Sequence, residues 1–135
     1  MADAGSGARG WGLAKVISSF RDLRVWQQGM DLVEQIYGVS RDFPKHEIYG
    51  LSSQMRRAAV SIPANIAEGH IRRQPRAYLN YVSIALGSLA ELQTELELAR
   101  RLGYIGPQQH SSIDTQTAAL ARQLQALRNS LSGAR

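Results

Sequence analysis

Cysteine is absent from the 135 residues of this chain. Its absence excludes disulfide bonds, thiolate metal ligands and thiol nucleophiles, and it suits a reducing compartment. Apolar residues make up 44% of the sequence, yet no apolar run approaches the roughly 18 residues that a membrane-spanning helix needs. The glycine- and alanine-rich start carries no apolar segment typical of a secretory signal. We therefore expect a cytoplasmic protein without a membrane span.

Residue combinations that support catalysis or metal binding are also missing. His46, His70 and His110 fall at or near the ends of predicted helices, where a surface imidazole is the simpler interpretation. The chain has no Glu-x-x-His pair of the kind that binds di-iron centres in helical bundles. Residues 5–10 match the G-x-G-x-x-G pattern of dinucleotide-binding loops, but they follow no predicted strand. We expect a non-enzymatic protein without metal or cofactor.

Apolar residues repeat at helical spacing in four segments after Phe20. The predicted helices cover residues 23–42, 47–68, 75–102 and a last segment from 107 onward, and their short connections favour antiparallel neighbours. The third helix carries an unbroken heptad seam of Tyr78, Val82, Ala85, Leu89, Leu92, Leu96 and Ala99. The sequence thus predicts an all-α protein, an antiparallel up-down four-helix bundle over residues 20–135, with a flexible N-terminal arm over residues 1–19.

Two residues of the second predicted helix bear on its shape. Pro63 removes one amide donor and crowds the preceding turn, so we expect a kink or local break over residues 59–63. Gly69 follows the last predicted helical residue, and we expect it to adopt the left-handed conformation that often ends helices.

A polar stripe runs along the same helix beside its apolar face. Polar side chains that border an apolar face form either an internal hydrogen-bond network or a solvated surface. The first interpretation predicts an intramolecular network of Arg57, Ser61, Asn65 and Glu68. The alternative, a stripe that is simply solvated, stays open.

The third predicted helix has a second stripe outside its heptad seam. Glu91 and Glu95 lie one turn apart in this stripe, and two like charges at that spacing are mildly unfavourable unless they are solvated or face arginines. A helix that is apolar on more than one side contacts more than one neighbour. We therefore expect a homo-oligomer with Glu91 and Glu95 at its interface. The full stripe comprises Ile84, Ser88, Glu91, Glu95, Leu98 and Leu102.

Arginine supplies most of the positive charge, since the chain has a net charge of +5 and only two lysines among 16 basic residues. Five of the arginines lie between residues 56 and 76, where Glu68 is the only acid. Guanidinium groups near a helix connection can reach a phosphate backbone without disturbing the core. We predict that nucleic acid is bound by Arg56, Arg72, Arg73 and Arg76, with Tyr81 as a base-stacking residue. A solvated basic turn is the alternative.

Several blocks of the sequence resemble one known family. They are Phe20-Arg21-Asp22-Leu23, Val25-Trp26-Gln27, the run from Glu47 to Gly69, and the run from Ala85 to Leu92. Together they resemble, in order and spacing, the four-helix-bundle proteins encoded within intervening sequences of bacterial large-subunit ribosomal RNA genes. The resemblance spans Phe20 to Ile105. The first nineteen residues have no counterpart in that family, and the last helix matches only in its apolar pattern.

The resemblance implies a small basic bundle that assembles into a ring, with a homopentamer as the expected form. A related group, the accessory variability determinants of diversity-generating retroelements, serves reverse transcriptases, so the resemblance also implies contact with RNA or DNA and a reverse transcriptase as partner. Two interpretations stay open. One is an accessory factor that binds RNA or an RNA–DNA hybrid, and the other is a structural homo-oligomer or protein adaptor whose arginines serve subunit contacts.

Overall fold

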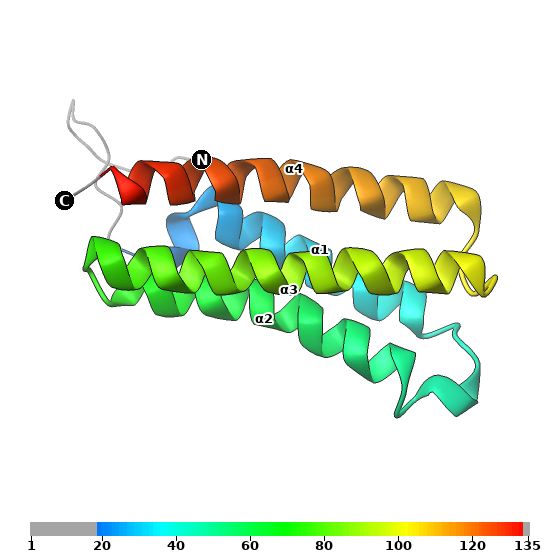
Figure 1. Cartoon of the computed structure of the whole chain (residues 1–135). Coiled ribbons are helices and arrows are strands. Elements are labelled where there is room, and N and C mark those ends of the chain that lie inside the picture. Colours follow the sequence, from blue (N-terminus) through cyan, green and yellow to red (C-terminus); the bar gives the residue numbers. More distant parts are fainter. Residues whose placement is uncertain (1–18, 134–135) are drawn as a thin grey trace.

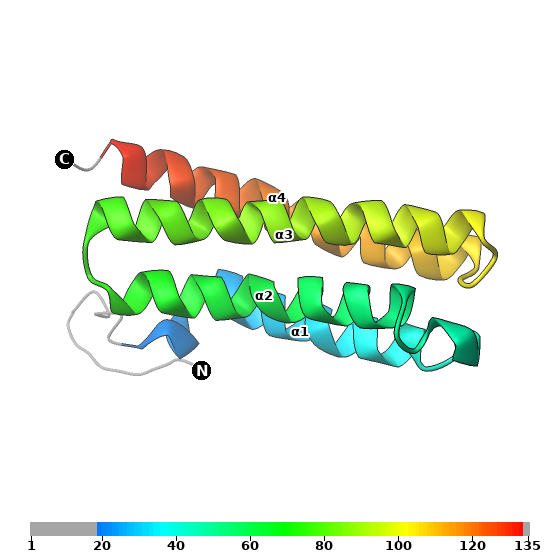
Figure 2. The same cartoon turned by 60° about the horizontal axis from the view of Figure 1, so that its bottom comes forward.

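The computed structural model describes residues 19–133, and every regular element in that range is a helix. Figure 1 shows that each long helix runs opposite to the one before it, and Figure 2 shows the same arrangement from below. The predicted antiparallel up-down four-helix bundle is therefore confirmed. The predicted arm lies outside the described residues except for Ser19. The elements are η1 (Phe20–Asp22), α1 (Arg24–Ser40), η2 (Lys45–Glu47), α2 (Leu51–Ile71), α3 (Pro75–Arg101) and α4 (Pro107–Ser132).

The core lies along the apolar seams where the helices face one another. The predicted heptad seam of α3 is buried along its whole length except at Tyr78, which is half-buried with its hydroxyl inside the protein. Ile36 of α1, Ile62 of α2 and Leu124 of α4 are fully buried against it. The periodicity of the sequence thus corresponds directly to the packing of the bundle.

The helix α2 begins at Leu51 rather than at the predicted Glu47. Glu47 belongs to η2, and its Oε1 accepts a hydrogen bond of 3.0 Å from the backbone N–H of Leu51. The other carboxylate oxygen accepts a bond of 2.8 Å from the Tyr104 hydroxyl. The hydrogen bond from the Leu51 amide, and to a smaller extent that from the Tyr104 hydroxyl, lower the pKa of the Glu47 carboxyl. Glu47 therefore caps α2 from outside, because its carboxylate binds an amide that has no partner within the helix.

Pro63 does not interrupt α2, so of the two expected outcomes, a kink or a local break, the break does not occur. Figure 1 shows the two halves of α2 running at different slopes, which agrees with the predicted kink. Pro63 is buried against α1 at Gly29, where an added Cβ would lie 3.3 Å from the Pro63 Cβ. The absence of a side chain at Gly29 lets the two helices approach closely.

Gly69 is not the residue that ends α2, because the helix continues to Ile71. It is buried against α3, and a Cβ added there would lie 2.8 Å from the Tyr81 Cβ. Within the connection from α2 to α3, the residue with positive φ is Arg73, at 58°. The glycine at position 69 is therefore required by close helix packing and not by backbone conformation.

Candidate nucleic-acid interface

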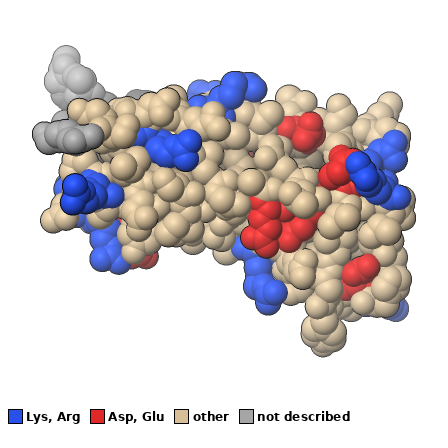
Figure 3. All heavy atoms as spheres, viewed as in Figure 1, with Lys and Arg blue, Asp and Glu red and all other residues tan. Residues whose placement is uncertain are grey.

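The up-down topology brings the start of α1, the α2–α3 connection and the end of α4 to one end of the bundle (Figures 1 and 2). Arginines occur in all three segments, and Asp22 and Glu68 are the acids among them. Six arginines against two acids give this end a net charge of +4. Figure 3 shows basic groups on this end, at the left of the view. We call it the basic end; its arginines are Arg21, Arg24, Arg72, Arg73, Arg76 and Arg128.

The α2–α3 connection presents its three arginines in two different ways. Arg72 donates a hydrogen bond of 2.8 Å to Glu68 Oε2 and one of 3.0 Å to the Tyr81 hydroxyl. Arg73 and Arg76 are exposed and form no ion pair with the described part of the chain. Arg72 is therefore held in place by neighbours that offset its charge, while Arg73 and Arg76 remain available to an external anion.

Tyr81 lies with the cluster but does not present an unoccupied ring. The guanidinium of Arg72 lies 5.4 Å from the centroid of its ring, and the residue is half-buried between α2 and α3. A base that stacks on Tyr81 has to share this ring with Arg72. Tyr81 therefore acts first as a support for Arg72.

A shallow hollow of about 550 Å³ lies beside Arg76 on the outer surface of α3. Its polar lining consists of two carboxamides, a hydroxyl and the guanidinium, at spacings that place them on one side of the first turns of α3. Hollows of this volume hold small ligands in many proteins. The sequence analysis did not identify it, although the helical spacing of these residues carries the signal. Its lining residues are Gln74, Arg76, Ala77, Leu79, Asn80 and Ser83.

Arg56 lies away from the basic end, contrary to the predicted grouping. It precedes Arg72 by roughly 24 Å along α2, at 1.5 Å per residue. Its Nε donates a hydrogen bond of 2.8 Å to Ser40 Oγ, and its guanidinium lies 4.7 Å from the centroid of the Tyr37 ring. The physical reason is the helix rotation, which directs Arg56 towards α1. Arg56 thus links α2 to α1, and its half-buried side chain is already engaged.

The predicted polar network forms only in its middle. The Asn65 side chain donates hydrogen bonds of 2.8 Å to the Ser61 carbonyl and 2.9 Å to Ser61 Oγ. Ser61 Oγ also lies 2.8 Å from Ser88 Oγ, so the network extends to α3 through a residue that sequence reasoning did not include. Glu68 pairs with Arg72 instead, and Arg57 is exposed without a hydrogen bond to the described residues. The pairing of Glu68 with Arg72 and the exposure of Arg57 leave only the serine–asparagine centre as a network.

Glu91 and Glu95 lie beside this network on α3, but in different environments. Glu91 is exposed, whereas Glu95 is only 5% exposed and its Oε1 has no hydrogen-bond partner among the described residues. Burial, and then the neighbouring Glu91 carboxylate, raises the pKa of Glu95 to about 7, and Arg57 opposes this effect. Figure 3 shows acidic side chains grouped near the middle of the visible surface, beside basic ones.

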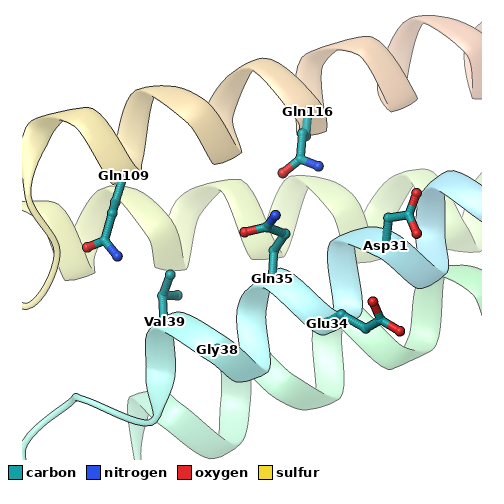
Figure 4. Close-up of a pocket in the computed structure, with 7 residues that line it drawn as sticks. All are labelled: Asp31, Glu34, Gln35, Gly38, Val39, Gln109 and Gln116. Carbon is teal, nitrogen blue, oxygen red and sulfur yellow. The ribbon is translucent and has the colours of Figure 1, made fainter.

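A separate groove of about 540 Å³ lies between α1 and α4, away from the basic end. Figure 4 shows its carboxamides and carboxylates, which include Asp31, Gln35 and Gln116. Its acidic lining repels a phosphate backbone, so the groove does not extend the candidate interface.

Within residues 19–133, no three His, Asp or Glu side chains are grouped so that they could hold a metal ion. None of the described helices combines the length and the apolar character needed to cross a bilayer.

Comparison with known proteins agrees with the fold and identifies the family. A crystal structure of a protein with unknown function from the S23 ribosomal protein family of Bacteroides thetaiotaomicron has a TM-score of 0.72 and 25% sequence identity. The similarity covers 77% of this chain and 97% of that chain. No curated protein matches the chain. The family model for 23S rRNA-intervening sequence proteins matches residues 21–126, from η1 into the second half of α4, and the chain therefore belongs to this family.

Proposed function

We propose that this protein is a non-enzymatic accessory factor that assembles into a ring, with a homopentamer favoured, and binds nucleic acid through its basic end. The observation that carries the proposal is the convergence of six arginines from three segments on one end of the bundle, against two acids. Converging guanidinium groups attract a phosphate backbone by charge and by hydrogen bonding.

The geometry favours binding without strong sequence preference. Arg73 and Arg76 extend from a helix connection and the first turn of a helix, and no helix of the bundle projects as a separate reading element for a groove. Phosphate contacts position a protein on nucleic acid, but they carry no sequence information directly. The hollow beside Arg76 adds polar groups that can contact an unpaired nucleotide of any type.

The family name refers to intervening sequences of 23S rRNA and names no ligand, and it makes rRNA the first nucleic acid to test. The similar protein from Bacteroides thetaiotaomicron belongs to the S23 ribosomal protein family, and its function is unknown. A reverse transcriptase as protein partner rests on the resemblance to accessory determinants of retroelements and is part of the same proposal.

A fluorescence-anisotropy titration against structured rRNA fragments, duplex DNA and single strands tests the proposal. The informative variant replaces Arg72, Arg73 and Arg76 with Ala. A control with the same net charge replaces Arg41, Arg100 and Arg101, which are exposed in the turn after α1 and in the last turn of α3, at the opposite end of the bundle. We expect the parent chain to bind at low salt, the first variant to bind at least tenfold more weakly, and the control to resemble the parent.

The competing function is a structural homo-oligomer or protein adaptor without nucleic-acid binding. The exposed apolar residues Ile84, Leu98 and Leu102 are consistent with it and equally with the proposed ring, since they are 44%, 47% and 56% exposed on α3 and at its C-terminal end and are suited to a protein contact. No binding at low salt would contradict the nucleic-acid proposal and support this competing one. Equal loss of binding in the two triple variants would contradict the assignment of binding to the basic end.

A further inference from the structure

The outer surface formed by α2 and α3 combines apolar and polar groups in an unusual way. Ile84 and Leu98 of α3 are about half exposed, and between them lie Ser88, Glu91 and the buried Glu95. The Ser61–Ser88 contact of 2.8 Å marks the line where α2 meets this stripe. We call this surface the α2–α3 face; its other members are Arg57, Asn65 and Leu102.

One carboxylate oxygen of Glu95, Oε1, is the feature of this face that the single chain does not explain. A buried carboxylate normally accepts hydrogen bonds, because an unsatisfied polar group in a low-dielectric site is costly. Glu95 Oε1 has no partner among the described residues, although the side chain lies at the edge of an otherwise exposed stripe. Glu91, one turn earlier on α3, raises the pKa of Glu95 by its charge and by a side-chain hydrogen bond, whereas Arg57 of α2 acts on it by charge alone. The site therefore lacks a donor that a molecule placed on the α2–α3 face can supply.

We infer that the α2–α3 face is the contact between copies of this chain, and that Glu95 accepts a hydrogen bond from a guanidinium of the neighbouring copy while Ile84, Leu98 and Leu102 are buried around it. The inference rests on the homo-oligomer in the proposed function and identifies the surface that forms it.

A second copy fits this face by charge and by apolar character. The chain carries 14 arginines and a net charge of +5, and exposed arginines such as Arg57 form no ion pair with the described residues, so each copy offers guanidinium groups to a neighbour. The half-exposed apolar residues on both sides of Glu95 exclude water from a docked ion pair, which strengthens it. The small residues Ala64 and Gly87 are exposed on the two helices, and an added Cβ at Gly87 would meet nothing within 4 Å. A neighbouring helix can therefore approach this face closely.

Substitution of exposed apolar residues tests the surface. Ile84→Lys and Leu102→Lys place a charge on the α2–α3 face, and Met30→Lys on α1 is the matched control, because Met30 is 38% exposed. We expect light scattering to give the oligomer mass for the parent and the control. In the two face variants we expect the dissociation constant of the oligomer to rise at least tenfold. Circular dichroism establishes that each variant is folded.

The pH dependence of assembly tests the role of Glu95. The charged groups that act on Glu95 in one chain are Glu91 of α3 and Arg57 of α2, and α4 contributes none among the described residues. Pairing with a guanidinium requires the ionised carboxylate, so association releases a proton. Below the pKa of about 7, the affinity between copies should therefore rise roughly tenfold for each unit by which the pH is raised. Glu95→Gln should remove this dependence while remaining able to fold.

The outcomes separate this inference from the proposal on which it rests. A parent chain with a monomer mass of 14.9 kDa at micromolar concentration overturns the assembly and the inference together. An oligomer that tolerates both lysine variants overturns the inference alone, and so does assembly that keeps its pH dependence in Glu95→Gln. Nucleic-acid binding is measured separately, and its loss leaves this inference unchanged.

Discussion

Replacement of Glu95 by Gln should stabilise the monomeric fold at alkaline pH and have little effect at acidic pH. The substitution keeps the shape of the side chain and removes the charge that burial makes unfavourable. The pKa of Glu95 rises from 4.5 to about 7 on folding, so the folded chain binds a proton at this carboxyl more tightly than the unfolded chain does. The contribution of this carboxyl to stability is fully present below pH 4.5 and is lost as the pH rises through 7.

The size of the effect follows from the same two values. The difference between 4.5 and about 7 corresponds to roughly 3 kcal/mol in the free energy of unfolding, at 1.36 kcal/mol per pKa unit. The side chain is only 5% exposed, so solvent screens little of this cost, although relaxation around Arg57 reduces it. We therefore expect Glu95→Gln to gain about 1–3 kcal/mol at pH 8 and to differ from its reference by less than about 0.5 kcal/mol at pH 4.

Urea denaturation followed by circular dichroism measures this difference. Both chains carry Ile84→Lys, so that subunit contacts do not contribute; position 84 lies roughly 16 Å along α3 from Glu95, where salt screens the added charge. Equal free energies of unfolding at pH 8 would show that Glu95 is solvated in the monomer. A loss of stability at pH 8 would show that the ionised carboxylate has a partner within the chain, and either result would refute the reasoning.

Three further predictions concern packing. Leu89→Ala should destabilise the fold by about 2–5 kcal/mol, because Leu89 is 1% exposed in the core and its loss leaves a cavity; a change below half a kcal/mol in denaturant titration would place it outside the core. In the chain carrying Ile84→Lys, Gly69→Ala should cost about 1–3 kcal/mol, because the new Cβ would lie 2.8 Å from the Tyr81 Cβ, whereas Gly87→Ala has open space in the single chain and should stabilise by up to about 1 kcal/mol. Thermal melts that rank the two glycine variants the other way would contradict the packing argument. Asn65→Leu should cost about 1–3 kcal/mol through its two lost bonds to Ser61, and a parent-like unfolding curve would mean that these bonds contribute nothing.

Helix periodicity made most of the fold predictable from the sequence. The apolar seam around Leu89 repeats at heptad spacing. Such a seam is buried wherever another helix packs against it, so its burial could be predicted without knowing which helix that is. Gly69 was misassigned because a glycine near a helix end looks the same in sequence whether it ends the helix or faces a neighbour. Only the position of Tyr81 on α3 decides between the two, and that contact joins residues from different helices.

The candidate site was partly predictable for a similar reason. Arg72, Arg73 and Arg76 are close in sequence and share a helix connection, so local reasoning grouped them correctly in space. Arg56 was grouped with them by sequence proximity, but the rotation of α2 directs it to Ser40 on α1. Conversely, Arg24 joins the basic end only through the topology. The predicted up-down order contained this information, since the first and third helices of such a bundle start at the same end.

The salt dependence of nucleic-acid binding by an Arg21→Ala, Arg24→Ala double variant tests most directly whether the basic end acts as one surface. Both residues are exposed and distant in sequence from the α2–α3 connection. If they contact phosphates, the slope of log affinity against log salt should become less steep by about 0.9 per lost contact on duplex DNA, or about 0.7 on single strands. A slope and affinity equal to those of the parent chain would contradict the account, because binding would not use the surface that the fold assembles.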